Sequence, residues 1–277
     1  MSPRGFGVEM VVEQTFEYFS LNGKTPSSDP SLPTPGLVPK ITVEPAPRPD
    51  GKKGLLYSSI VLCDDKVNPK GLFSSEEVTS YRTSMKVTVP FSWRKHVGHV
   101  IIFGSGMQAL RNTRLILMLR ASEVRSITYV SPVRDQAKQL IATKLELRLR
   151  NINCICCTTS SKKPLFPASY VANKGSRCPL ISAIGSWKSD MIELDPELLR
   201  LAVQPNAGYN PIIGKDDGVI LVDDRDFALT NSGEFVESRM NTKDVIERGE
   251  ILTLRSGKLS SVSLTDKVVE KTDRFCS

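Results

Sequence analysis

Residues 99–119 read HVIIFGSGMQALRNTRLILML and carry the strongest structural signal in the chain. An apolar run at 100–103, predicted to be a strand, enters a glycine turn, and a helix-compatible segment follows at once. Gly104 would let the chain turn tightly, Gly106 would leave room for a pyrophosphate, and Ala109 would let helix and strand pack closely. The helix N-terminus would point free N–H groups at the anion. The pattern predicts a dinucleotide site formed by Gly104, Ser105, Gly106, Met107, Gln108 and Ala109; a tight turn in an ordinary α/β domain is the alternative.

The segments that follow alternate between strand-like and helix-like patterns. Strands are predicted at 126–130, 153–157, 179–185 and 218–224, and helices from the glycine turn to about residue 120 and at 135–150. This order predicts an α/β fold, a Rossmann-type doubly wound parallel sheet with helices on both faces.

The N-terminal part has a different composition. Residues 8–21 place apolar side chains at helical spacing, whereas eight prolines between 25 and 49 exclude a continuous helix there. Short strands are predicted at 40–43 and from residue 54, followed by a turn into a helix at 73–85 whose N-cap is Ser74 or Ser75. We therefore expect three parts. These are a small α+β domain at 1–90 with a proline-rich segment at 25–50, the Rossmann-like domain at 91–240, and a tail at 241–277 that begins with a helix-like stretch, VIERGEIL.

The composition, 40% apolar and 24% charged over 277 residues, is that of a globular protein. No apolar run is long enough for a transmembrane helix, and Glu9 and Glu13 interrupt the apolar N-terminus. We therefore expect no membrane partner, no secretion signal and a cytoplasmic location. The net charge of +7 is scattered and lacks interleaved aromatics, which argues against nucleic acid. No cysteine or histidine has zinc-like spacing, so we expect no metal site and interpret Cys154, Cys156 and Cys157 as buried free thiols.

Several segments occur together in one order. They are GLLYSSIVLCD, EEVTSYRTSM, IIFGSGMQA, CCTTSSKKPLFPASYV and LISAIGSWKSDMIELDPELL, followed by VILVDDRDFALTNSGEF. In these segments the chain resembles the ornithine cyclodeaminase/mu-crystallin family of NAD(P)-dependent amino-acid and imine enzymes, as a shortened, divergent and fungal-like member. The resemblance implies a Rossmann domain for the cofactor and a smaller, truncated substrate and dimerisation domain. It also implies hydride transfer between the nicotinamide and the α-carbon of a small amino or imino acid, in a homodimer.

The resemblance further implies roles for single residues. Arg82, in the Arg-Thr-Ser stretch, would hold the substrate carboxylate, since a guanidinium fork suits bidentate binding. Lys40 would lie near the reacting carbon as the catalytic residue. Thr159 and Ser161, at the end of the third strand, would lie beside the nicotinamide. The alternatives are a helix-surface arginine, a solvated lysine and a simple strand-capping turn.

The end of the second strand indicates which dinucleotide is bound. A carboxylate there favours NAD, whereas small polar and basic residues accommodate a 2′-phosphate. Here the chain has Ser131 and Arg134, with Lys138 one turn on. We therefore favour NADP over NAD as the cofactor; a helix cap at Ser131 and a solvated face for the two basic residues are the alternatives.

Three departures separate the chain from this family. Trp187 stands where true cyclodeaminases carry a catalytic aspartate, and an indole cannot act as a general acid or base. About one strand–helix unit is absent between the helix at 135–150 and the next strand. Both ends of the substrate domain are short, which should expose apolar surface and weaken dimerisation. Two hypotheses follow: an NAD(P)-dependent oxidoreductase, or a degenerate, non-catalytic nucleotide-binding relic of the same family. An unrelated α/β binding module is a third reading.

Overall fold

The structure, a computed structural model, describes residues 40–43, 57–63, 68–131, 138–172, 178–204 and 220–255. The described residues up to Thr83 form one compact unit, and those from Ser84 on form the other. The expected helix at 8–21 lies outside the described residues, and the expected domain bounds stay predictions. No helix among the described residues is both long and apolar enough to cross a lipid bilayer.

The smaller unit holds a three-stranded antiparallel sheet in the order β1-β2-β3. Its strands are β1 (Lys40–Val43), β2 (Tyr57–Cys63) and β3 (Pro69–Ser74). The first two lie where the sequence predicts strands, whereas β3 was not expected. Its hairpin places Leu72 opposite Val61 and Phe73 opposite Ile60, but both β3 side chains are exposed. Because β3 lacks alternating buried and exposed positions, its sequence carries no strand pattern.

Helix α2 (Ser75–Ser92) begins where the sequence predicts a helix and continues through Pro90. Proline has no N–H, so the carbonyl of Lys86 loses its usual donor four residues along the helix. Arg248, the first residue of α8 (Arg248–Arg255), donates its Nη1–H to that carbonyl at 2.7 Å. The guanidinium of Arg248 and the ammonium of Lys86 both bind the carboxylate of Asp223. These contacts join α2, α8 and the end of β8 (Ile220–Val222).

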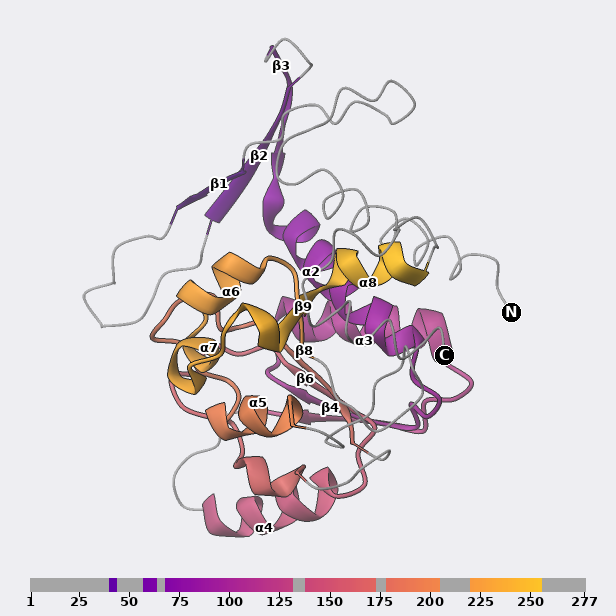
Figure 1. Ribbon diagram of the computed structural model, residues 1–277. Coiled ribbons are helices and arrows are strands. Elements are labelled where there is room, and N and C mark those ends of the chain that lie inside the picture. Colours follow the sequence, from indigo (N-terminus) through magenta and orange to yellow (C-terminus); the bar gives the residue numbers. More distant parts are fainter. Residues whose placement is uncertain are drawn as a thin grey trace, which may run out of the picture. The chain divides into compact units, whose positions relative to one another are not determined.

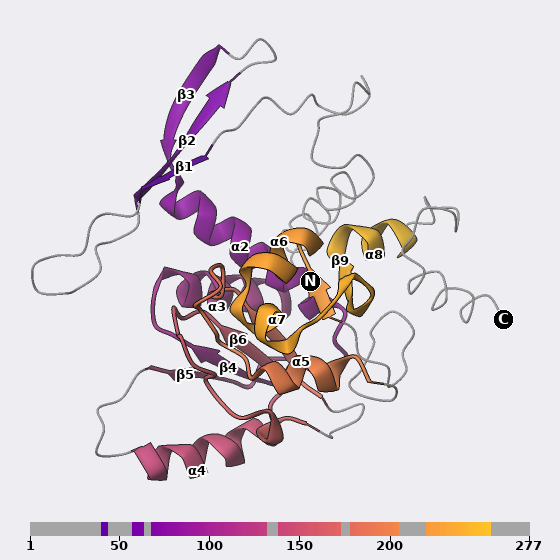
Figure 2. The same cartoon turned by 60° about the vertical axis from the view of Figure 1, so that its left-hand side comes forward.

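The larger unit is built on a four-stranded parallel sheet in the order β5-β4-β6-β7. Its strands are β4 (His99–Phe103), β5 (Ser126–Val130), β6 (Cys154–Cys157) and β7 (Leu180–Ala183). The sheet lies between α3 (Met107–Arg120) and α4 (Lys138–Leu149), as Figures 1 and 2 show. This arrangement confirms the predicted Rossmann-type, doubly wound fold.

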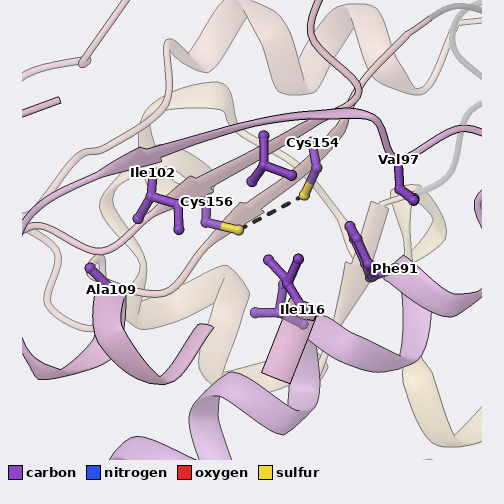
Figure 3. Close-up of a cluster of buried hydrophobic side chains, with 9 residues drawn as sticks. Phe91, Val97, Ile102, Ala109, Ile116, Cys154 and Cys156 are labelled. Carbon is purple, nitrogen blue, oxygen red and sulfur yellow. Dashed lines mark hydrogen bonds between the residues drawn. The ribbon is translucent and has the colours of Figure 1, made fainter. Parts of the chain in front are cut away.

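Successive side chains of β4 and β6 point to opposite faces of the sheet, and they form two apolar cores, one on each face. The first is formed with α2 and α3 and includes Phe91, Val97, Val100, Ile102, Ala109, Ile116, Cys154 and Cys156 (Figure 3). The sulfurs of Cys154 and Cys156 lie 3.9 Å apart within it. The second is formed with α4 and includes Ile101, Phe103, Leu149, Ile155 and Cys157. The three cysteines are therefore buried free thiols, as interpreted from the sequence.

One strand was assigned to the wrong sheet. The segment 218–224 was expected to be a fifth strand of the main sheet, but β8 pairs in parallel with β9 (Val245–Glu247) in a separate two-stranded sheet. The stretch VIERGEIL, expected to be a helix, is β9 followed by α8. Its first residues, Val245 and Ile246, are β-branched and buried beside β8. The helix begins only at Arg248, after the N–H of Glu247 donates to the Glu250 carboxylate at 2.8 Å.

Strand β5 is an edge of the described sheet. No strand lies between residues 138 and 153, so the chain passes from α4 directly to β6. Among the described residues, no further strand pairs with the outer side of β5.

Candidate functional site

The glycine turn after β4 lies where the ends of three strands meet. Gly104 has φ +109°, and a Cβ on it would lie 2.5 Å from Oγ1 of Thr158, the residue that follows β6. The N–H of Gly104 donates to the carbonyl of Val130 at the end of β5, at 2.8 Å. Thr158 Oγ1 in turn donates to the carbonyl of Phe103 at 2.7 Å. Position 104 therefore requires glycine both for its backbone conformation and for its contact with β6.

The turn leaves the start of α3 open. Gly106 is the N-cap, no side chain caps the helix, and the first turn contains no acidic residue. A Cβ on Gly106 would meet nothing within 4 Å, and Ser105, Gly106 and Met107 are exposed. The first N–H groups of a helix have no partner within it and attract anions. Ala109, by contrast, is 1% exposed and packs in the first core. The residues of this turn therefore fit the pyrophosphate of a dinucleotide.

The side chain of Gln108, which the sequence predicts as part of the cofactor site, is turned toward α2. Its Oε1 accepts a hydrogen bond from Oγ of Ser84, which is fully buried, at 3.3 Å. This contact joins the first turn of α3 to α2.

The loops after β6 and β7 are held by a buried carboxylate that the sequence analysis missed. Glu193 is 0% exposed. Its Oε1 accepts from the N–H of Thr159 at 2.5 Å and from Oγ1 of Thr159 at 2.8 Å, and its Oε2 accepts from the N–H of Gly185 at 2.7 Å. Burial raises the pKa of Glu193 despite these donors. The only sequence signal was an acidic residue between apolar ones in MIELD.

A second buried carboxylate, Glu234 of α7 (Gly233–Ser238), supports the first. Its Oε1 accepts from Oγ of Ser186 at 2.5 Å and from the N–H of Glu193 at 2.8 Å. Its Oε2 accepts from Oγ of Ser232 at 2.9 Å. The two acids thus join α7 to both loops at the carboxyl end of the sheet.

The two hydroxyls predicted beside the nicotinamide are already hydrogen-bonded within the protein. Thr159 donates to Glu193, as described, and Ser161 Oγ donates to the carbonyl of Lys163 at 2.6 Å. Thr159 adjoins Thr158, which contacts Gly104, so the structure brings this loop beside the glycine turn. Ser161 lies farther along the same loop, where the N–H of Ile192 donates to its carbonyl at 2.8 Å.

Trp187 follows Gly185 in the loop after β7 and is 40% exposed. The Nζ of Lys188 lies 4.5 Å from the centroid of its ring, a cation–π contact. Asp190, the nearby carboxylate, is exposed and forms an ion pair with Lys162 at 2.5 Å. Neither residue supplies a buried acid at the position where cyclodeaminases carry their aspartate.

Four predicted site residues remain: Ser131, Arg134, Lys40 and Arg82. Ser131 is exposed directly after β5, next to the carbonyl that receives Gly104 N–H. Arg134 lies outside the described residues. Lys40 begins β1 and Arg82 is an exposed residue of α2, both in the smaller unit. In the described parts of the chain, no three His, Cys, Asp or Glu side chains cluster in a way that could hold a metal ion.

Known proteins resemble this chain mainly in fold. No protein-family model matches the sequence. The chain is 25% identical over 252 residues to the uncharacterized protein YGL159W of Saccharomyces cerevisiae, with coverage of 74% of this chain and 65% of that protein. The chain thus spans just under two thirds of the length of this relative.

Three solved structures illustrate the similarity in fold. The Δ1-pyrroline-2-carboxylate reductase of Thermococcus litoralis, in complex with NADH and L-proline, is 18% identical with a TM-score of 0.63, over 90% of this chain and 82% of that one. The probable ornithine cyclodeaminase of Bordetella pertussis is 17% identical with a TM-score of 0.64, over 92% and 83%. The iminosuccinate reductase of Paracoccus denitrificans, in complex with NAD⁺, is 16% identical with a TM-score of 0.59, over 91% and 81%. The chain therefore has the Rossmann-type fold of ornithine cyclodeaminase-like proteins, as the sequence resemblance predicts.

Proposed function

We propose that this chain is an NAD(P)-dependent oxidoreductase that transfers a hydride between the nicotinamide and the α-carbon of a small amino or imino acid. One observation carries the proposal. The fourteen-residue helix α3 starts at a glycine turn with no capping side chain and with open space at Gly106. An N-terminus of this kind, at the carboxyl end of a parallel sheet, is a binding site for a phosphate group.

The protein's part in this chemistry is to bind and orient. The backbone of Gly104 to Ala109 would hold the pyrophosphate, and Ser131 and Arg134 would accept the 2′-phosphate of NADP, which we favour over NAD. The loop with Thr159 and Ser161 would lie beside the nicotinamide. When bound, the cofactor supplies the hydride chemistry, while the protein supplies position and electrostatics.

On the substrate side, the proposal assigns Arg82 to the carboxylate and Lys40 to the reacting group. Trp187 has no titratable group, so a reaction that requires a general acid at this position is disfavoured. We therefore propose reduction of an imino acid, or oxidation of an amino acid, rather than cyclisation of ornithine with loss of ammonia.

Titration with NADPH and NADH, followed by the fluorescence of the reduced cofactor, tests the cofactor site. We expect NADPH to bind more tightly. Gly106→Val should abolish binding, because its side chain would occupy the space of the pyrophosphate. The matched control is Gly98→Val. Gly98 precedes β4, at the end of that strand opposite the glycine turn, and a Cβ on it would have only ordinary van der Waals contacts, at 3.6 Å and beyond. Equal affinity of Gly106→Val and the wild type would show that the turn is not a phosphate site.

Trp187 favours a second candidate, a non-catalytic nucleotide-binding protein. Turnover separates the two: cyclic imino acids are added with NADPH, simple amino acids are added with NADP⁺, and the absorbance of the reduced cofactor is followed. Oxidation of NADPH by an imino acid supports the enzyme. Tight binding without turnover of any substrate supports the relic, and failure to bind either cofactor contradicts both.

We also propose a homodimer that uses the smaller unit. In that unit Leu72 and Phe73 of β3 are 72% and 52% exposed, and Val78 and Tyr81 of α2 are exposed as well. Apolar surface of this kind is typical of an interface. Sedimentation analysis should give a dimer for the wild type and a monomer for Leu72→Lys; a monomeric wild type would contradict the proposal.

A further inference from the structure

We propose that Glu193 is a positioning residue, one that sets the distance between the loops after β6 and β7 and thereby forms the nicotinamide end of the cofactor site. This inference rests on the proposed function and deepens it. The glycine turn would hold the phosphates through backbone groups alone, so it needs no help from Glu193. The reacting end of the cofactor has no such cradle and depends on how the two loops are placed.

The loops after β6 and β7 touch each other closely at Gly185. A Cβ on Gly185 would lie 1.7 Å from the carbonyl oxygen of Thr159 and 2.7 Å from Cδ of Glu193. Nothing larger than glycine fits there. At this contact the backbone N–H of Gly185 and that of Thr159 both point at the Glu193 carboxylate, at 2.7 Å and 2.5 Å.

Each oxygen of the carboxylate serves a different loop. Oε1 accepts from Thr159, through both its N–H and its hydroxyl, and Oε2 accepts from Gly185. An ionised carboxylate is the one side chain of this size with two acceptor-only oxygens. In Glu193→Gln one oxygen becomes an NH₂ group, which faces an N–H donor and cannot bond to it. One loop is then released, although the side chain keeps its size.

Glu234 fixes the position of the backbone that carries Glu193. It accepts the backbone N–H of Glu193 at 2.8 Å and of Leu194 at 3.2 Å, as well as the hydroxyl of Ser186 at 2.5 Å. Both acids are buried, at 0% and 2% exposure. Full hydrogen bonding is what makes burial of such groups tolerable, and it gives the network a single geometry.

The test compares two ligands that share one end. NADPH has both the phosphates and the nicotinamide, whereas 2′-phospho-ADP-ribose has the phosphates without the nicotinamide. In Glu193→Gln the affinity for NADPH should fall about tenfold, the equivalent of one lost hydrogen bond to a charged group, while that for 2′-phospho-ADP-ribose stays within about twofold. The matched control, Glu197→Gln, removes an exposed carboxylate at the start of α5 (Pro196–Ala202) and should change neither affinity.

A second measurement, amide hydrogen exchange, reports on the stability of the two loops directly. Hydrogen exchange at the Thr159 and Gly185 amides should be faster in Glu193→Gln, while exchange in β4 stays at the wild-type rate. If Glu193→Gln does not fold, Ser186→Ala removes one hydroxyl that Glu234 accepts and carries the same differential prediction. Equal losses for both ligands, or no loss for either, would overturn the positioning role. Failure of the wild type to bind either 2′-phospho-ADP-ribose or ADP-ribose would instead contradict the proposed function.

Discussion

Replacing Arg248 with alanine should destabilise the protein by an amount that depends on Pro90. The carbonyl of Lys86 lacks a helix donor because of Pro90 and receives Arg248 Nη1 at 2.7 Å instead. Arg248→Ala removes this hydrogen bond and the ion pair with Asp223. The Arg248 side chain is only 14% exposed, so water replaces little of what is lost. Two hydrogen bonds to a charged donor, each about 1.5 kcal/mol, predict a loss of about 3 kcal/mol in the free energy of unfolding.

The variant Pro90→Ala tests whether the missing N–H of Pro90 causes part of the loss of stability in Arg248→Ala. Alanine at 90 restores an N–H that donates to the Lys86 carbonyl, so removal of Arg248 no longer leaves that oxygen without a donor. In this background Arg248→Ala should lower the free energy of unfolding by about 1.5 kcal/mol, half its effect in the wild type. Urea unfolding of the wild type, both single variants and the double variant measures the four free energies. If the single effects add to within about 0.4 kcal/mol, the reasoning is refuted.

Three further predictions concern the backbone, a titrating carboxylate and the buried thiols. Gly104→Ala should lower the free energy of unfolding by about 2 kcal/mol, because its φ is +109° and a Cβ would lie 2.5 Å from Thr158 Oγ1. In the same urea titrations Gly106→Ala should stay within about 1 kcal/mol of the wild type. Burial raises the pKa of Asp223, but the neighbouring cations outweigh it and hold that pKa below its ordinary value. The stabilisation by Asp223 is therefore present above its unfolded pKa of about 3.9 and is lost as the pH falls through the folded value. The difference in stability between the wild type and Asp223→Asn should shrink only below about pH 4, and a constant difference under acid conditions would contradict the assignment. The contact with Cys156 and burial raise the pKa of Cys154, and burial raises that of Cys157. Both thiols should therefore resist iodoacetamide in the native protein and react after denaturation, as mass spectrometry can measure; rapid native labelling would contradict their burial.

Much of the larger unit could be predicted from sequence because its signals are local. The strand at β4 is an apolar run, and Gly104 and Gly106 mark the turn that follows. The sheet to which β8 belongs could not be predicted in this way. The residues Ile220 to Val222 indicate a strand but not its partner, because β8 pairs with β9, which lies farther along the chain. Strand β3 was missed because Pro69 and Gly71 interrupt its pattern and its side chains are mostly exposed.

The candidate site likewise has one part that the sequence predicts and one part that it does not. The turn at Gly104 and the open start of α3 follow from residue types that are adjacent in sequence. The bridge through Glu193 does not, because its partners Thr159 and Gly185 are separated from it by a strand or a loop and meet it only in the folded chain. Glu234 is more distant still, and no local pattern marks an acid that hydrogen-bonds backbone N–H groups in a core.

The central place of β4 in the sheet has a consequence for folding. β4 pairs with β5 by closing the loop between His99 and Ser126, and with β6 by closing the loop between Val100 and Cys154, which is about twice as long. Each doubling of a loop adds about 0.6 kcal/mol to the entropic cost of closing it. We therefore expect β4, α3 and β5 to assemble first and β6 to dock afterwards. The glycine turn would then form early, before Thr158 arrives to pack against Gly104.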